Sequence, residues 1–267
     1  MTTFPTLFVS HGAPNLLLHE SPARDFLAGF CQTLVDRGLG RPQAILVASA
    51  HFEMAVPSVC ADEKPGLIYD FKGFEEELYK IDYPAPGLPG LATIAADLIE
   101  QSGFPAQEIV GRGLDHGVWV PLKLIFPEAD IPVVQMAVQP DQGAGHHIAL
   151  GRALAPLRKH GVLIIGSGSL THNLKEVLQG GRVVDAPVLD WVQDFEDWIL
   201  TKAEAGAIDE IADYRSLAPH ARENHPTEEH FLPFAFAFGA AGEGAKGARA
   251  HHSVQYGAMA MDAYLFE

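Results

Sequence analysis

The stretch Ala-Ile-Leu-Val-Ala-Ser-Ala-His (44–51) decides the fold class, because it is a continuous apolar run that ends in a histidine. A strand with one exposed face alternates apolar and polar residues, whereas a strand covered on both faces reads as an unbroken apolar run. Three further runs have this character, and they span Thr6–Ser10, Ile131–Val138 and Val162–Ile165. The sequence therefore predicts several strands that are buried on both faces.

Helical patterns lie between these runs. Pro89–Gln101 begins with proline and stops before a glycine, Ile148–His160 has apolar residues at helical spacing, and Asp185–Ala205 begins with an aspartate that can cap a helix. The glycine- and alanine-rich stretch Gly239–Ala250 is typical of a loop. Strands that alternate with helices predict an α/β fold, in which a mostly parallel or mixed sheet is flanked by helices. We expect residues 1–267 to form a single domain.

The composition excludes some classes of partner. The formal charge is −16 with no clustered Lys and Arg, which argues against nucleic acid and anionic membranes as partners. No apolar run approaches the roughly 20 residues that span a bilayer, and the first residues do not resemble a signal peptide. We therefore expect a cytoplasmic protein. Cys31 and Cys60 are too few for a disulfide framework and are expected to be buried apolar residues. The oligomeric state is left open.

Histidines follow three of the predicted strands. His11 comes directly after Thr6–Ser10, His51 ends the run at 44–51, and His172 follows the strand at Val162–Ile165 after a short loop. Ligands of α/β folds bind outside the carboxyl ends of the strands. Each histidine alone could be a hydrogen-bonded residue at a strand end, but the repeated placement favours one shared cleft.

Two further histidines have a supporting context. His230 follows Thr227, which is a candidate N-cap for a helix that would carry His230 in its first turn and Pro233 just inside. A surface helix is the alternative there. His116 follows Asp115 in a glycine-flanked loop, although adjacent residues seldom pair directly; packing against a neighbouring tryptophan is the alternative.

The remaining histidines carry weaker signals. The adjacent pairs His146–His147 and His251–His252 are expected on the surface or in loops, and four others have no supporting context: His19, His160, His220 and His225. Sets of imidazoles, with or without a carboxylate, are typical of zinc and of non-haem Fe(II) sites. The residues by themselves do not distinguish the two metals.

An ordered set of motifs resembles one known family over nearly the whole chain. The chain resembles the class III extradiol ring-cleavage dioxygenases, in the branch similar to 4,5-DOPA extradiol dioxygenase. Each motif is weak alone, but their order is specific, and it departs from the family pattern at Ala13, where relatives often carry serine. The motifs are Ser-His-Gly-Ala-Pro (10–14), Arg-Pro-Gln-Ala-Ile-Leu-Val-Ala-Ser-Ala-His-Phe (41–52), Tyr-Asp-Phe-Lys-Gly-Phe (69–74), Tyr-Pro-Ala-Pro-Gly (83–87), Leu-Asp-His-Gly-Val-Trp (114–119), Gly-Ser-Gly-Ser-Leu-Thr-His-Asn-Leu (166–174) and Glu-His-Phe-Leu-Pro (229–233).

The resemblance implies a role for each matching histidine. His11 and His51 would be metal ligands, and His230 would be the third ligand, at a place where the protocatechuate-cleaving branch has glutamate. Glu228 and Glu229 leave a carboxylate ligand open. His172 would be the catalytic acid and base and, particularly with zinc, also a fourth ligand.

The same resemblance implies the reaction. Fe(II) would be the working metal, with Zn(II) a candidate in the purified protein. A catechol such as DOPA would be opened by O2 to a muconic semialdehyde, and His116 would contact the substrate from outside the ligand sphere. Two rival interpretations are a zinc-dependent hydrolase and a non-catalytic metal-binding interaction protein on the same fold. A dinucleotide enzyme is weaker, because Gly-Ser-Gly-Ser lacks the full GxGxxG spacing.

Overall fold

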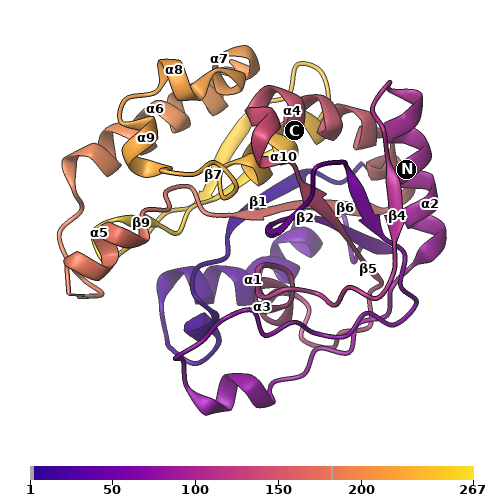
Figure 1. Cartoon of the computed structure of the whole chain (residues 1–267), viewed down its shortest axis with the longest axis horizontal. Coiled ribbons are helices and arrows are strands. Elements are labelled where there is room, and N and C mark those ends of the chain that lie inside the picture. The colour runs from indigo at the N-terminus through magenta and orange to yellow at the C-terminus, as the bar shows by residue number, and fades with distance from the viewer. Residues whose placement is uncertain (1–2, 182) are drawn as a thin grey trace.

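Figure 1 shows a computed structural model of the chain, which describes residues 3–181 and 183–267. An eight-stranded sheet runs through its centre. In sheet order the strands are β4 (Gln107–Ile109), β3 (Ser58–Cys60), β5 (Val133–Val138), β2 (Ala44–Glu53), β6 (Val162–Gly168), β1 (Thr6–Ser10), β10 (Ala263–Phe266) and β7 (Gly247–His251). A second sheet pairs β8 (Val254–Gln255) with β9 (Met259–Ala260).

The sheet is mixed, as predicted. Strands β5, β2, β6 and β1 run parallel, whereas β3 pairs antiparallel with β5 and β10 pairs antiparallel with β1. Because β6 lies between β1 and β2, the carboxyl ends of all three strands meet at one edge. That edge receives the residues that follow each strand.

Helices cover both faces of the sheet (Figure 1). The α-helices are α1 (Pro22–Asp36), α2 (Pro89–Gln101), α3 (His116–Ile125), α4 (Gly143–Leu154), α5 (Leu174–Gln179), α6 (Asp190–Ala205), α7 (Ile208–Ala212), α8 (Tyr214–Leu217), α9 (Ala221–Asn224) and α10 (Leu232–Ala240). Four 3₁₀-helices complete the described helices: η1 (Pro14–Leu17), η2 (Glu76–Lys80), η3 (Pro140–Gln142) and η4 (Ala155–His160). Within the described ranges, no helix is both long and apolar enough to cross a bilayer.

The unbroken apolar runs have the predicted cause. Along β2, Ile45 and Val47 pack into the core beneath α1 and α3, while Leu46 and Ala48 pack into the core on the opposite face, beneath α2, α4 and α10. Alternate residues of one strand thus enter two different cores, so neither set can be polar.

Some predicted helix boundaries are wrong. The helix expected over Ile148–His160 begins earlier, at Gly143, and its last residues tighten into η4. The helix expected from Asp185 begins at Asp190. Cys60 is buried as predicted, but Cys31 is only half-buried, at the margin of the core beneath α1.

The expected loop over Gly239–Ala250 is confirmed only for residues 241–246, because both ends of the stretch are regular structure. Helix α10 continues to Ala240 and β7 begins at Gly247. A Cβ atom on Gly239 would lie 2.1 Å from the carbonyl oxygen of Ile148 on α4. This glycine therefore permits close packing of α10 on α4 and does not make the chain flexible.

Candidate metal centre

His11, His51 and His230 converge at the carboxyl edge of the sheet. His11 follows β1 directly, and His51 lies within β2, which continues to Glu53. The Nε2 atoms of His11 and His51 are 3.0 Å apart, and one ring nitrogen from each of the three histidines lies within 4.8 Å of the others. Two ligands bound at about 2.1 Å to one ion are separated by roughly 3.0–3.4 Å, so this spacing suits a shared metal.

Ser167 fixes the proton on the outer nitrogen of His11. The Ser167 hydroxyl donates its hydrogen to the carbonyl oxygen of Gly117. It can therefore only accept from His11 Nδ1, which lies 3.0 Å away. With its proton on Nδ1, His11 presents an unprotonated Nε2 to the other two histidines, as a metal ligand requires.

His230 reaches the same point from a turn, not from a helix. The turn lies on the end of β6, where Ser169 donates its backbone N–H to the His230 carbonyl at 3.0 Å. A Cβ atom on Gly168 would lie 2.1 Å from that carbonyl oxygen, so the glycine is needed for this contact. The predicted helix over His230 is wrong: α10 begins at Leu232, with Pro233 in its first turn, where a missing N–H costs nothing.

Glu229 orients the His230 ring. Its carboxylate accepts from His230 Nδ1 at 2.9 Å and from the Thr227 hydroxyl at 3.1 Å. Thr227 therefore holds this carboxylate and does not cap a helix. Glu228 faces elsewhere, towards Tyr214 and Arg215.

Asp70 holds His116, and Asp115 does not. The carboxylate of Asp70 accepts from both the ring Nδ1 and the backbone N–H of His116, at 2.8 and 3.0 Å, and lies 3.8 Å from Nδ1 of His51. Although burial opposes ionisation, the hydrogen bonds from His116 lower the pKa of Asp70 to about 2. The His116 ring lies 4.0 Å from that of His51, between centroids.

Asp115 is instead a buried support for β2. It accepts from Ser49 Oγ at 2.7 Å, from Arg112 Nη2 at 3.0 Å and from Gln135 Nε2. The same Arg112 nitrogen donates to the His51 carbonyl at 2.9 Å. This network fixes the strand segment that carries His51.

His172 lies beside the three converging histidines. Its ring stacks on that of His230, with centroids 3.5 Å apart and an interplanar angle of 12°. Its nitrogen falls within 4.8 Å of ligand atoms on Glu229 and His230, a group separate from that of His11 and His51. Burial lowers the pKa of His172 and the Glu229 carboxylate opposes this. The ring is therefore neutral near pH 7 and can accept a proton.

The electrostatics of the cluster fit a cation. Burial, followed by the neighbouring imidazoles, lowers the pKa of His11 and His230 well below the ordinary value. Burial and His116 lower the pKa of His51 to about 3. Neutral imidazoles with lone pairs turned towards one point are the donor set that zinc and non-haem Fe(II) accept.

Sequence patterns alone did not identify several of these residues. Asp70 lies in the Tyr-Asp-Phe motif and Ser167 lies near the end of β6, and neither was predicted to contact a histidine. The position of Ser167 follows from the strand order, because β6 between β1 and β2 must supply a neighbour for His11, whereas Asp70 lies in a loop that the strand order does not place.

One further histidine differs from expectation, and a second is buried where the sequence gave no prediction. His147, expected on the surface, is buried: Nδ1 donates to the Gly143 carbonyl at 2.7 Å, and Nε2 accepts the Gln139 N–H at 3.0 Å. His225 is also buried, with Nε2 3.2 Å from the Ser169 carbonyl. His252 is exposed as predicted.

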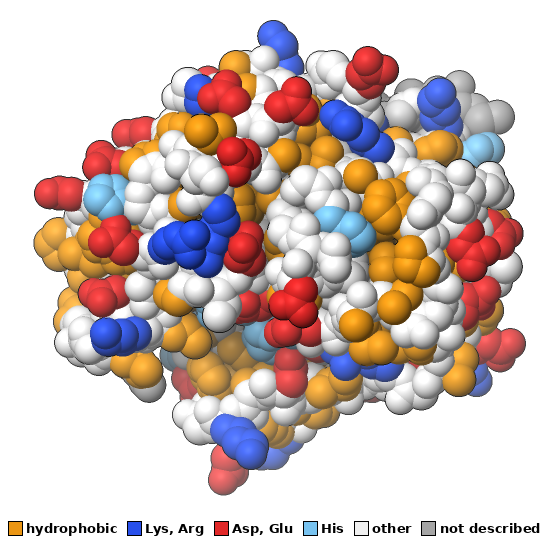
Figure 2. Space-filling view, turned by 45° about the horizontal axis from the view of Figure 1, so that its top comes forward, with side chains coloured by type: hydrophobic (Ala, Val, Ile, Leu, Met, Phe, Trp, Pro, Cys, Tyr) orange, Lys and Arg blue, Asp and Glu red, His pale blue; other side chains and the backbone are white. Residues whose placement is uncertain are grey.

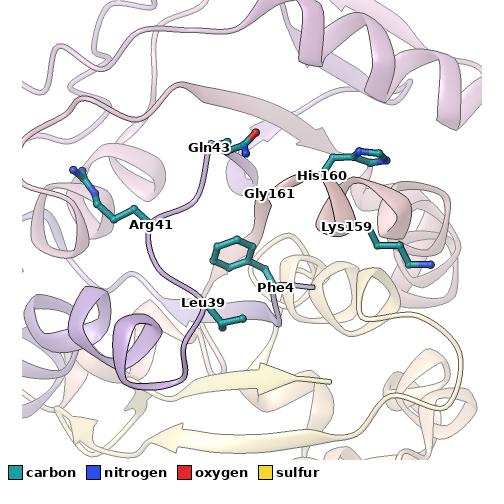
Figure 3. A pocket seen from close by; sticks show the side chains of 7 residues that line it. All are labelled: Phe4, Leu39, Arg41, Gln43, Lys159, His160 and Gly161. Atoms are coloured by element: carbon teal, nitrogen blue, oxygen red, sulfur yellow. The ribbon is translucent and has the colours of Figure 1, made fainter. Parts of the chain in front are cut away.

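A cavity of about 420 Å³ lies away from the histidine cluster (Figure 3). Gln43 and Gly161 in its wall immediately precede β2 and β6, so it opens at the amino ends of the strands. Its Arg41 is paired with Asp130. We assign no function to this cavity, because ligands of such folds bind at the opposite edge.

Figure 2 shows one face of the molecule, on which acidic, basic and hydrophobic side chains are interspersed. A histidine lies there in a shaded hollow bordered by hydrophobic and acidic side chains. The interspersed charges on this face agree with a small-molecule ligand more than with a polyanion.

The fold and the cluster together define a class: α/β proteins with a histidine site suited to metal at the carboxyl edge of a mixed sheet. Residues 5–266 match the family described as the catalytic LigB subunit of aromatic ring-opening dioxygenase, and the chain belongs to this family. The predictions of the family and of an oxidoreductase are thereby confirmed, and the family is metal-dependent.

Individual relatives cover nearly the whole chain. The chain is 43% identical to a 4,5-DOPA dioxygenase extradiol of Beta vulgaris, over 98% of its own length and 96% of that protein. It is 34% identical to one of Escherichia coli strain K12, over 90% and 86% of the two chains. The crystal structure of an uncharacterized Escherichia coli K12 protein matches with a TM-score of 0.76 at 28% identity, over 98% and 99%.

Proposed function

We propose that the chain is a non-haem Fe(II) extradiol dioxygenase that opens a catechol such as DOPA with O2, giving a muconic semialdehyde. One observation carries the proposal: the inner nitrogens of His11, His51 and His230 face one another, and Ser167 and Glu229 hold protons on the outer nitrogens of His11 and His230. The names of the curated relatives support DOPA as the first substrate to try.

His11, His51 and His230 would hold the iron as a three-histidine set. Bound Fe(II) would bring the catechol and O2 together and let electron density pass from one to the other. The protein would supply orientation, through side chains that are already fixed by Ser167, Glu229 and the Asp115 network.

His172 would accept a phenolic proton as the catechol binds. Its neutral ring lies against His230, at the margin of the cluster, and a free imidazole can return the proton later in the reaction. His116, held by Asp70, would donate a hydrogen bond to a substrate oxygen on which negative charge develops. These two roles, and a fourth-ligand role for His172, are proposals.

The test combines oxygen uptake with product detection. Metal-depleted protein would receive Fe(II) without air, then L-DOPA or another catechol from a panel, and then O2. We expect one O2 consumed per ring opened and a yellow product. A matched control is His160→Ala, which removes an exposed histidine far from the cluster and should leave turnover unchanged.

The same assay can also give results that contradict the proposed reaction or the proposed role of His172. Fe(II)-loaded protein that opens none of the catechols would contradict the dioxygenase proposal. Hydrolysis of an ester or amide without oxygen uptake, with zinc in place of iron, would instead support a zinc hydrolase. Turnover that survives His172→Ala would remove this histidine from the proposed proton transfer.

A further inference from the structure

A second cluster of metal-ligand side chains lies outside the strand-end site. It joins Glu196 of α6, His252 after β7 and Asp262 before β10. His252 Nδ1 is 2.8 Å from Asp262 Oδ1 and 3.3 Å from Glu196 Oε1, and one ligand atom from each residue lies within 4.8 Å of the others. No residue of the strand-end site is shared.

The cluster contains buried polar groups without partners. Glu196 is 0% exposed, and neither of its carboxylate oxygens has a hydrogen-bond partner among the described residues. The hydroxyl of Tyr264 is likewise buried and unpartnered there. Unpaired buried carboxylates are costly, so this arrangement calls for a ligand of positive charge.

The neighbouring side chains satisfy the carboxylate of Asp262 but leave that of Glu196 without a hydrogen bond. The single Nδ1–H of His252 can donate well to only one carboxylate, and the shorter contact is to Asp262. Arg249 Nη1 approaches the other oxygen of Asp262, Oδ2, at 3.5 Å. Both oxygens of Glu196 therefore remain without a hydrogen-bond partner among the described residues, although Oε1 lies 3.3 Å from His252 Nδ1.

The donor set has the chemistry of a transition-metal site. One imidazole nitrogen with two carboxylate oxygens suits zinc or manganese, and separations of 2.8 and 3.3 Å are close to the roughly 3.0–3.4 Å between ligands of one ion. The His252 side chain is 39% exposed, which gives an ion a path from solvent.

We propose that Glu196, His252 and Asp262 bind a second divalent transition-metal ion, which ties α6 to the C-terminal strands. The ion would also help to fix the end of β1 that carries His11. The Asp262 carbonyl accepts the backbone N–H of Ser10, one residue before His11, at 3.0 Å. This ion has a structural role, separate from the proposed ring opening.

The experiment counts Zn²⁺ ions on the metal-depleted full chain by equilibrium dialysis and metal analysis. We expect two ions per chain in the wild type and one in the double variant His11→Ala/His230→Ala. Adding Glu196→Gln to that variant should reduce binding to zero. Saturating Zn²⁺ should raise the Tm of the double variant on the order of 5 °C at a hundredfold excess over Kd, and not that of the triple variant.

A second variant distinguishes loss of the metal site from misfolding caused by the substitution of buried Glu196. His252→Ala changes an exposed residue and should lower the wild-type count from two ions to one, while His251→Ala, whose ring nitrogen contacts Ser253 instead, should keep two. One ion in the wild type that is unaffected by His252→Ala would overturn the proposal. One ion that is lost with His252→Ala would support it and would refute metal binding at the strand ends.

Discussion

His51 and His147 are both buried histidines with a lowered pKa, but their ring nitrogens have different partners. Burial lowers the pKa of both rings to about 3. In His147, however, both ring nitrogens are occupied by backbone groups of its own helix region, whereas Nε2 of His51 faces Nε2 of His11. A depressed pKa therefore marks burial, and only unpartnered nitrogens that meet at one point mark a metal site.

The largest effect should come from removing a converging histidine. In His230→Ala we expect loss of the bound metal and a fall in turnover of more than about 100-fold, the upper range for residues that merely support ligands. In His147→Gln, metal content and turnover should be retained. Metal analysis and oxygen uptake on both variants decide this, and equal losses in the two would erase the distinction between the sites.

A smaller effect should follow from the serine that fixes His11. Ser167→Ala leaves the His11 Nδ1–H without an acceptor and frees the ring to take the other tautomer. We expect metal affinity to fall by about 10- to 100-fold. Competition with a metal chelator measures it. The matched control is Ser169→Ala, whose hydroxyl contacts the Thr171 carbonyl and no histidine; an equal loss there would mean a general effect of the loop.

Asp70→Asn should affect turnover more than metal binding. The amide cannot accept from His116 as strongly as the carboxylate, so the ring is less well oriented. We expect kcat to fall roughly tenfold, about the value of one hydrogen bond to a charged group, with metal content unchanged. Asp130→Asn removes an exposed carboxylate as the control. Loss of metal in Asp70→Asn would assign Asp70 to the ligand set.

The sequence was sufficient for the four central parallel strands of the sheet, but not for its outer strands or for the whole site. Runs such as Ala44–Ala50 predicted buried strands, because a strand between two cores cannot alternate. It also indicated His11 and His51, since their places depend only on strand ends. The turn that carries His230 was predicted as a helix, because its conformation depends on the long-range contact of its carbonyl with Ser169 and Gly168.

The partners of the histidines were the least predictable part. Asp115 adjoins His116 in the sequence, yet Asp70, 46 residues away, holds the ring. Conversely, Glu229 does pair with its neighbour His230. Sequence distance is a poor guide here, because local backbone geometry decides whether adjacent side chains meet. The burial of His147 has the same origin, since α4 begins earlier than its apolar spacing indicated.

The smallest expected effect is the contribution of His147 to the pH dependence of stability. With a folded pKa of about 3 and an ordinary value of 6.5, His147 takes up its proton only on unfolding over that pH range. The unfolded state then binds more protons than the folded state, so stability falls as the pH drops from about 6.5 towards 3. Between pH 7 and pH 5 this one residue should account for about 2 kcal/mol of lost stability.

The substitution His147→Gln should remove this contribution of His147 to the pH dependence of stability. We expect the variant to be less stable than the wild type at pH 7 by about 1–3 kcal/mol, because its two backbone hydrogen bonds are disturbed, and to lose less stability on going to pH 5. Urea unfolding of the metal-loaded protein at both pH values measures the difference. His146→Gln, which alters a half-buried neighbour, should change the pH dependence less. An unchanged pH dependence in His147→Gln would mean that this ring takes up its proton while folded, and burial would then not separate it from an exposed histidine.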